Sequence, residues 1–406
     1  MDITTAKEQV IDAGIRLVKQ GLISRTWGNV SCRIDEKSFV ITPSGKPYET
    51  LTPEQIVLVN IETLEYEGEI KPSSEKGVHA EVYRARPEIN FVIHTHQINA
   101  SIFSALGSNI RYVPPVAAKA IGKNVPFAQY GLPGTKTLKE GVAAVLARSK
   151  SKAVIMAHHG ALCFGEDSDT AFEAALQLED VCEHHLFLRF KKEYGVEVSD
   201  MSQFVKKMAE KAIGAKNFDL KETIGYCSFR KEDNFVLNRS DNSEKPIVVC
   251  ISTGNVVNGG KMSAESELHR AVYLKRADIK YIIHSRQSEL VAVSFLGKTL
   301  KPQVDDYAQI VGVDVRCAEF DEKNAKKTAL QCVKAMNRRH GLLLKDDGAL
   351  CCGTNESDAR AVEMIMEKNC LTFLGTMLYN VNQPITPLHS HLMRFVYLKK
   401  YSKQAE

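Results

Sequence analysis

The segment EINFVIHTH, residues 88–96, restricts the fold more than any other part of the sequence. Its largely apolar run, from Ile89 to Ile93, is typical of a buried strand and leads into two histidines that are two residues apart. Residues i and i+2 of a strand project to the same face, so one metal ion can bind both imidazoles. The sequence therefore predicts a strand whose end carries part of a metal site, His94 and His96.

A second pair of histidines, His158 and His159, follows the apolar run AVIMA (residues 153–157) and precedes a glycine. The loop KPSSE, residues 71–75, adds a carboxylate, Glu75, at the start of a predicted helix. Neutral imidazoles together with one carboxylate are the ligands of a catalytic zinc site, which keeps a position that opens for substrate. A lone histidine near a strand end is usually an ordinary polar residue, but two such clusters and the carboxylate loop favour a metal site.

The second half of the chain repeats the first, which indicates a duplicated domain. The matching segments are KPSSE (71–75) and KMSAE (261–265), FVIHTH (91–96) and YIIHSR (281–286), and HHGALC (158–163) and DDGALC (346–351). His79 and Tyr83 of the first copy likewise reappear as His269 and Tyr273. A chance repeat of this length is implausible.

Strand patterns and helix patterns alternate along the chain, which predicts an α/β architecture. In the first copy we expect a first helix that ends at Gly21, strands at 28–31, 38–42, 56–61, 89–94, 125–128 and 152–157, and further helices at 75–86, 97–106, 135–149 and 168–191. We expect one domain over residues 1–195 and another over 221–406. The polar segment 196–220, rich in lysine and serine, is the expected linker.

The two copies differ at the residues that carry the chemistry. Arg286 stands where the first copy has His96, and a cation cannot bind a metal cation. Asp347 stands where the first copy has His159, and Gly28 and Asn29 have no evident counterpart. We therefore expect the second copy to keep the scaffold, to lack the metal site, and to be non-catalytic.

Composition and charge exclude several classes of protein. The chain has 406 residues and a net charge of +4, which is too small to indicate a nucleic-acid partner. No run of about 18 apolar residues is present, so we expect no membrane-spanning helix. The ten cysteines contain no CxxC motif and fall mostly in apolar segments, which suits reduced thiols and a cytoplasmic location.

The motifs of the first copy together resemble the class II aldolase/adducin family, a group of sugar-phosphate aldolases and epimerases. The resemblance is strong over residues 1–195 and weaker over 221–375, and it includes the segments GNVS (28–31) and ITPSG (41–45) as well as those above. It implies an α/β fold, a three-layer α/β/α sandwich with a mainly antiparallel central sheet, in two tandem copies. It also implies one Zn²⁺ per chain, in the first domain, with another divalent metal such as Mn²⁺ as an alternative.

The resemblance also assigns roles to single residues. It implies His94, His96 and His159 as metal ligands and Glu75 as a fourth ligand that leaves the metal to act as general acid and base. It implies a cradle for the substrate phosphate made of Asn29, Ser44, Gly45, Ser73 and Ser74.

The resemblance further implies an oligomer. In the family a tyrosine from a neighbouring subunit serves as proton donor, and Tyr112 occupies the matching loop, with Tyr307 and Tyr379 as alternatives. Family members are fourfold rings, so a tandem chain is expected to form a homodimer with a pseudo-fourfold ring, or a larger homo-oligomer.

The function that follows is a lyase, a metal-dependent aldolase. We expect it to cleave a deoxy-ketose 1-phosphate to dihydroxyacetone phosphate and an aldehyde such as lactaldehyde. Glu75 favours this reaction because epimerase-like members carry aspartate at its position. The alternatives are a pentulose-phosphate 4-epimerase, a sugar-phosphate dehydratase, and a non-catalytic adducin-like interaction module.

Overall fold

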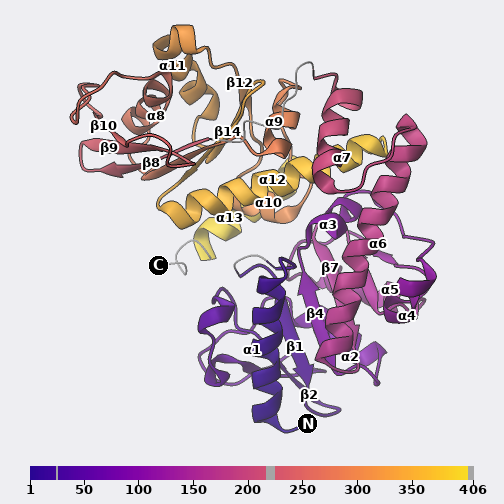
Figure 1. The fold of residues 1–406 in the computed structure, drawn as a ribbon. Coiled ribbons are helices and arrows are strands. Elements are labelled where there is room, and N and C mark those ends of the chain that lie inside the picture. The colour runs from indigo at the N-terminus through magenta and orange to yellow at the C-terminus, as the bar shows by residue number, and fades with distance from the viewer. Residues whose placement is uncertain (24–25, 216–224, 401–406) are drawn as a thin grey trace. The chain divides into compact units, whose positions relative to one another are not determined.

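A computed structural model describes residues 1–23, 26–215 and 225–400 of the chain (Figure 1). The chain divides into two compact units. The first unit comprises Met1–Leu188, Tyr379–Gln383 and Val396–Glu406, and the second comprises Arg189–Leu378 and Pro384–Phe395. Each unit contains one seven-stranded sheet.

The first unit is built from seven strands and the helices that cover them. Its strands are β1 (Asn29–Arg33), β2 (Ser38–Ile41), β3 (Val57–Asn60), β4 (Phe91–Thr95), β5 (Phe127–Ala128), β6 (Ala153–Met156) and β7 (Gly160–Gly165). Its helices are α1 (Ile3–Lys19), η1 (Tyr48–Thr50), η2 (Pro53–Gln55), α2 (Lys76–Ala85), α3 (Ile98–Ser104), α4 (Pro115–Ile121), α5 (Lys136–Leu146) and α6 (Ser168–Tyr194), which continues into the second unit. All strands expected from the sequence are present, and β7 and α4 are additions.

The strands of the first unit are ordered β3-β2-β1-β4-β7-β6-β5. Neighbouring strands pair antiparallel except at the edge, where β5 and β6 pair parallel. The sheet is therefore mixed, which amends the expectation of a mainly antiparallel sheet. At its centre β4 lies between β1 and β7, so the strand that ends in His94 and Thr95 is paired on both sides.

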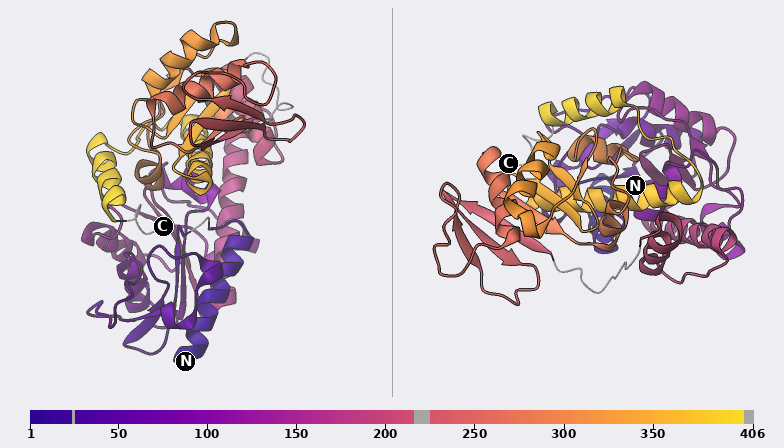
Figure 2. Two further views of the ribbon diagram at one scale, coloured as in Figure 1. Left: turned by 90° about the vertical axis from the view of Figure 1, so that its left-hand side faces the viewer. Right: turned by 90° about the horizontal axis from the view of Figure 1, so that it is seen from above.

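Helices α2 and α5 pack on the sheet through apolar residues spaced one helical turn apart. Val78 and Val82 of α2 and Leu138 and Val142 of α5 all belong to one buried cluster with residues of β2, β4, β6 and β7. Helix α1 packs along β1 and β2 (Figures 1 and 2). These contacts fix the start of α2, where Glu75 lies, against the middle of the sheet.

The second unit repeats this arrangement, with the sheet order β10-β9-β8-β11-β14-β13-β12. Its strands are β8 (Tyr226–Lys231), β9 (Asn234–Arg239), β10 (Ile247–Cys250), β11 (Tyr281–Ser285), β12 (Cys317–Ala318), β13 (Gly341–Leu344) and β14 (Gly348–Gly353). Its helices are α7 (Met201–Met208), η3 (Ala209–Ile213), α8 (Ala264–Lys275), α9 (Ser288–Ser294), α10 (Asp305–Ile310), η4 (Glu322–Asn324), α11 (Ala325–Met336) and α12 (Glu356–Leu378); α13 (Pro387–Lys400) spans the boundary between the units.

The segment expected to be a linker contains helical structure. Helix α7 and the π-helical turn η3 follow one another, and Phe204, Val205 and Met208 are buried within the second unit. Residues 216–220 of that segment lie outside the described residues. The sequence did not predict these helices because only one face of α7 is apolar, and its lysines make the segment polar on average.

The strand registers correct one expectation about the repeat. Asn29 pairs with His94 in the first unit, and Tyr226 pairs with His284 in the second, so GNVS does have a counterpart that begins at Gly225. A Cβ on Gly28 would lie 2.7 Å from the carbonyl oxygen of His94, and a Cβ on Gly225 would lie 1.9 Å from that of His284. Both copies thus need glycine where the chain passes the central strand.

Within the described part of the chain, every helix is too short or too polar to cross a membrane.

Candidate metal centre

His94 and His96 bring two imidazoles together at the end of β4. Their Nε2 atoms lie 2.9 Å apart. The other ring nitrogen of His94, Nδ1, lies 2.9 Å from the carbonyl oxygen of Ala161 in β7 and donates to it. This hydrogen bond fixes the tautomer of His94 and leaves the lone pair of Nε2 directed at the other ligands. The prediction that both histidines share one face is consistent with this geometry.

The turn between β6 and β7 positions the third imidazole. His158 has a φ of +56°, so position 158 needs a residue that tolerates the left-handed conformation. A Cβ on Gly160 would lie 2.3 Å from the carbonyl oxygen of Thr95, so position 160 needs glycine. The side chain of His158 contacts Tyr130 instead of the site. The ring of His159 stacks on that of His94, with centroids 4.7 Å apart. The motif alone left open which histidine of the pair joins the cluster, the family resemblance implied His159, and the structure places His159 there.

Glu75 closes the cluster from the start of α2. Its Oε1 lies 2.6 Å from Nε2 of His159, and its Oε2 lies 3.1 Å from Nε2 of His94. The ligand atoms of His94, His96 and His159 all lie within 4.8 Å of one another. Four side chains therefore converge on one point. His94 and His96 come from the end of β4, His159 from the turn between β6 and β7, and Glu75 from the start of α2.

Burial sets the charge states of this cluster. Burial lowers the pKa of His94 well below its ordinary value, so its imidazole is neutral. Burial alone would raise the pKa of Glu75, but the interactions with His159 and then with His94 outweigh it and keep that pKa well below the usual range. An ionised carboxylate beside a neutral imidazole with a free lone pair is the state that binds metal.

The donor set fits a divalent cation of the zinc type. It offers three imidazole nitrogens and one carboxylate oxygen, all on buried or half-buried side chains, and at least one imidazole is oriented by a backbone carbonyl. Nitrogen-rich sets of this kind suit zinc and related transition metals better than magnesium or calcium. In the described residues this is the one group of at least three such side chains whose ligand atoms come this close.

Asn29 lies behind the carboxylate and not in an open cradle. Its Nδ2 donates to Oε2 of Glu75 at 2.9 Å, and its Oδ1 lies 2.5 Å from Nε2 of His79. His79 in turn contacts the hydroxyl of Ser31 at 2.6 Å. Sequence reasoning assigned no role to His79; its repetition as His269 was the signal that pointed to it.

The other expected phosphate residues come from two loops that lie side by side. Pro43 and Pro72 form an antiparallel bridge, and the backbone N–H of Ser44 donates to the carbonyl oxygen of Lys71 at 3.0 Å. The hydroxyl of Ser73 accepts from the N–H of Glu75 at 3.2 Å, whereas Ser74 is exposed. Gly45 is exposed and has a φ of +71°.

A pocket of about 330 Å³ opens beside Ser74 and Glu75. Three lysines line it, namely Lys76 at the start of α2 and Lys136 and Lys139 in the first turn of α5. Glu75 therefore belongs both to the cluster and to the lining of a pocket that carries three lysines.

Tyr112 is not part of the cluster. Its side chain is 59% exposed, and its carbonyl oxygen accepts a hydrogen bond of 2.7 Å from Nε2 of His185. Of the two alternatives, Tyr307 is fully buried in the second unit, and the hydroxyl of Tyr379 donates to the carbonyl oxygen of His185.

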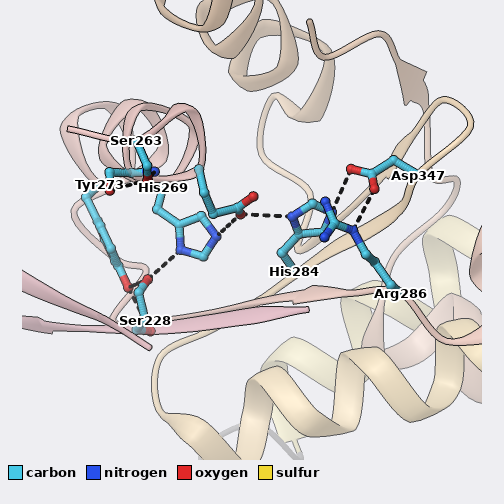
Figure 3. A network of polar contacts seen from close by, with 9 residues as sticks. Ser228, Ser263, His269, Tyr273, His284, Arg286 and Asp347 are labelled. Atoms are coloured by element: carbon cyan, nitrogen blue, oxygen red, sulfur yellow. Dashed lines mark hydrogen bonds and ion pairs between the residues drawn. The ribbon is translucent and has the colours of Figure 1, made fainter. Parts of the chain in front are cut away.

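The equivalent position in the second unit holds a chain of ion pairs (Figure 3). Nδ1 of His284 lies 2.8 Å from Oε1 of Glu265, and its Nε2 lies 3.0 Å from Oδ2 of Asp347. Nε of Arg286 donates to Oδ1 of Asp347 at 2.7 Å. Both nitrogens of His284 thus face carboxylates, and no lone pair on this ring remains for a metal.

Charge in the second unit balances without a metal. Burial would lower the pKa of His284, but Glu265 and Asp347 outweigh it and raise that pKa to about 9. Burial would raise the pKa of Asp347, but His284 and Arg286 lower it to about 2. Two cations, His284 and Arg286, therefore face two anions, Glu265 and Asp347.

Comparison with known proteins matches both halves of the chain to one family. The model of the class II aldolase and adducin N-terminal domain matches residues 8–186 and again residues 212–374. L-fuculose phosphate aldolase from Escherichia coli strain K12 is 34% identical over 186 residues, which are 46% of this chain and 85% of that protein. The 5-deoxy-D-ribulose 1-phosphate aldolase of Bacillus thuringiensis serovar kurstaki is 36% identical over 174 residues, 43% of this chain and 80% of that protein.

Among solved structures, L-fuculose-1-phosphate aldolase from Thermus thermophilus is 28% identical, with a TM-score of 0.41, and the match covers 48% of this chain and 98% of that one. The two matches to the family model together span most of the 406 residues. The chain therefore belongs to the class II aldolase and adducin N-terminal domain family and contains two copies of that domain.

Proposed function

We propose that the first unit is a metal-dependent lyase, an aldolase that cleaves a deoxy-ketose 1-phosphate to dihydroxyacetone phosphate and an aldehyde such as lactaldehyde. The observation that carries this proposal is the convergence of His94, His96 and His159 with Glu75. The relatives named as aldolases of L-fuculose phosphate and 5-deoxy-D-ribulose 1-phosphate support the choice of a phosphorylated sugar.

The three histidines would hold the cation, Zn²⁺ in this proposal with Mn²⁺ as an alternative, and Glu75 would complete the donor set before substrate binds. When bound, the cation supplies a Lewis acid that stabilises negative charge developing on the substrate oxygens. The histidines contribute by staying neutral, because neutral ligands leave the full double charge of the cation available. His94 meets this requirement through its burial and its hydrogen bond to Ala161.

Glu75 would move the proton. Breaking the C3–C4 bond of a ketose 1-phosphate leaves an electron pair on C3, which must be protonated to give dihydroxyacetone phosphate. In the reverse direction a base must remove that proton. Glu75 is ionised, buried and held beside the cluster by Asn29, so it suits the base that removes this proton in the direction of synthesis. In cleavage it would return the proton to C3 as the acid, after the carboxylate has taken one up.

The substrate phosphate would lie over the two paired loops. Ser44, Ser73 and Ser74 offer hydroxyls there, Gly45 and Ser74 offer backbone N–H groups, and Asn29 has a second amide hydrogen beyond the one donated to Glu75. The pocket with its lysine-lined walls adjoins Ser74 and supports an anionic ligand at this place.

Tyr112 would exchange a proton with the aldehyde oxygen across a subunit interface. Its exposed side chain, which the cluster of its own unit does not engage, supports a role in a neighbouring chain, within a dimeric pseudo-fourfold ring or a larger homo-oligomer. Co-expression of Tyr112→Phe and His94→Ala chains tests this. Mixed oligomers regain activity if Tyr112 acts between chains, and stay inactive if it acts within its own chain.

The finer architecture and location complete the proposal. A three-layer α/β/α arrangement in each unit is supported by helices that contact the sheet through separate sets of residues. In the first unit α2 and α5 share one buried cluster with the sheet, whereas α1 and α3 contact the sheet without contributing to that cluster. In the second unit α8 and α11 share the corresponding cluster, whereas α9 and α12 contact the sheet without contributing to it. A cytoplasmic enzyme is supported by ten cysteines that are all free thiols.

The experiment that tests the function is a measurement of dihydroxyacetone phosphate released from a panel of ketose 1-phosphates, with and without chelator. We expect release from at least one deoxy-ketose 1-phosphate and loss of release after chelation, restored by Zn²⁺ or Mn²⁺. Activity that survives complete removal of metal would contradict the proposal.

A further inference from the structure

A chain of buried hydrogen bonds runs from the interior of the first unit to Glu75. The hydroxyl of Tyr83 lies 2.7 Å from Oγ of Ser31, which lies 2.6 Å from Nδ1 of His79. Nε2 of His79 lies 2.5 Å from Oδ1 of Asn29, whose Nδ2 donates to Glu75 at 2.9 Å. His79 is fully buried and takes no direct part in the metal cluster.

The chemistry of the partners fixes the direction of each hydrogen bond. Oδ1 of Asn29 is only an acceptor, so Nε2 of His79 must carry the proton. Nδ1 of His79 is then an acceptor, so Ser31 donates its single hydroxyl proton to it. Ser31 in turn accepts from the hydroxyl of Tyr83. The amide of Asn29 is thereby locked with its oxygen towards His79 and its NH₂ group towards Glu75.

The second unit keeps the same chain without a metal site, as Figure 3 shows. Oγ of Ser228 lies 2.8 Å from the hydroxyl of Tyr273 and 2.7 Å from Nδ1 of His269. Nε2 of His269 lies 2.8 Å from Oε1 of Glu265. Nε2 of the histidine faces an acceptor in both units, but in the second it reaches the carboxylate directly, because Tyr226 occupies the position of Asn29.

We propose that His79 is a positioning residue for the reaction of the first unit, acting on Glu75 through Asn29. This inference rests on the proposed function. With His79 in place, the amide of Asn29 has one orientation, in which it donates to the carboxylate. Without His79 the oxygen of Asn29 loses its donor, so the amide is no longer held at both ends and its hydrogen bond to Glu75 is less firmly oriented. Asn29 lies between His79 and Glu75, so the histidine acts on the carboxylate only through the amide. The second amide hydrogen of Asn29 points away from Glu75 and is available to substrate.

Three variants test the proposal by steady-state kinetics with saturating metal. His79→Leu removes both ring nitrogens, His79→Gln keeps a side-chain N–H for Asn29, and His269→Leu is the matched control with equal burial in the second unit. We expect His79→Leu to lower kcat by about 10–100-fold, the usual cost of losing such an outer hydrogen-bond partner. His79→Gln should recover most of that loss, and His269→Leu should keep the wild-type kcat.

Equal effects of His79→Leu and His269→Leu on kcat would overturn the proposal, because a purely structural role predicts the same loss for both. The shape of the pH profile separates the roles further. We expect His79→Leu to shift the profile of kcat, because the hydrogen bond to Glu75 changes, while His269→Leu leaves the profile unchanged.

A second measurement needs no activity and no metal. In protein labelled with ¹⁵N-histidine and ¹⁵N-asparagine, the His79 ring should show the neutral tautomer protonated at Nε2 between pH 5 and 8, and the Asn29 side-chain amide should shift in His79→Leu but not in His269→Leu. A ring protonated at Nδ1, or an Asn29 amide insensitive to His79→Leu, would overturn the proposal. A wild-type protein that releases no dihydroxyacetone phosphate would instead contradict the proposed function, and these resonances would still decide the role of His79.

Discussion

The two units share a fold and a polar chain but satisfy their central charges in different ways. The first unit gathers three imidazoles around Glu75, a set that needs a cation to balance it. The second unit supplies its own cations, His284 and Arg286, against Glu265 and Asp347. The paired cations and anions of the second unit neutralise its buried carboxylates without a metal, and this pairing matters because an isolated buried charge is costly.

The largest difference in effect between the two units should come from removing the histidine that they share, His94 in the first and His284 in the second. We expect His94→Ala to abolish metal binding and turnover, because it removes the imidazole that contacts both His96 and Glu75. The matched control is His284→Ala, which should retain turnover but destabilise the second unit by about 3–5 kcal/mol through its unpaired carboxylates. Turnover assays and denaturant unfolding of both variants check this. Undiminished turnover in His94→Ala would end the proposed mechanism.

Neutralising the shared carboxylate should have the next strongest effect. Glu75→Gln should keep metal, because the three histidines remain, and should lower turnover by about 10²–10⁴-fold, the usual contribution of a general acid or base. Glu265→Gln should leave turnover unchanged. Metal analysis and kinetics of both variants make the measurement. Wild-type turnover in Glu75→Gln would remove the proposed role of this residue.

Two substitutions should convert the second unit into a copy of the first. Nε2 of His284 already faces Asp347, which stands at the position of His159. The double variant Arg286→His/Asp347→His should therefore bind a second divalent cation, which raises the metal content from one to two per chain. Each single variant should stay at one, because it keeps either a competing cation or an incomplete ligand set. A double variant that also stays at one would show that further differences, such as Tyr226, close the site.

The mildest difference between the units should be a loss of stability above pH 6.5 that is confined to the second. The folded pKa of His284, about 9, is above its ordinary value of 6.5, so its stabilisation is complete below pH 6.5 and is lost as the pH rises through 9. Asp347, with a pKa of about 2 against 3.8, contributes above pH 3.8 and loses its contribution as the pH falls through 2. Hydrogen exchange of β11 and β14 between pH 6 and 10, corrected for intrinsic rates, should report a loss on the order of a few kcal/mol. Equal losses in β4 and β7 would contradict this assignment.

Much of the first unit could be predicted because its signals are local. The run before His94 gives β4, the spacing of two residues gives a shared face, and the repeated segments give the second copy. The sequence singled out His94, His96, His159 and Glu75 as one candidate metal site, and the structure brings their side chains together.

Other features depend on contacts that local patterns do not encode. Strand β7 begins at Gly160, inside a motif that was interpreted only as a pair of candidate metal-binding histidines. Helix α7 lies in a segment whose polar composition is typical of a linker. The choice of His159 over His158 depends on a left-handed turn, and the role of Asn29 behind Glu75 depends on His79 from another element. The counterpart of Asn29, Tyr226, became visible only from the strand register.

Anomalous scattering at the zinc absorption edge, from crystals of the wild-type protein grown with Zn²⁺, would locate and count the bound cations. We predict one strong peak per chain, between the Nε2 atoms of His94, His96 and His159, and none beside His284. A peak between His284 and Asp347, or no peak among the three histidines of the first unit, would contradict the account.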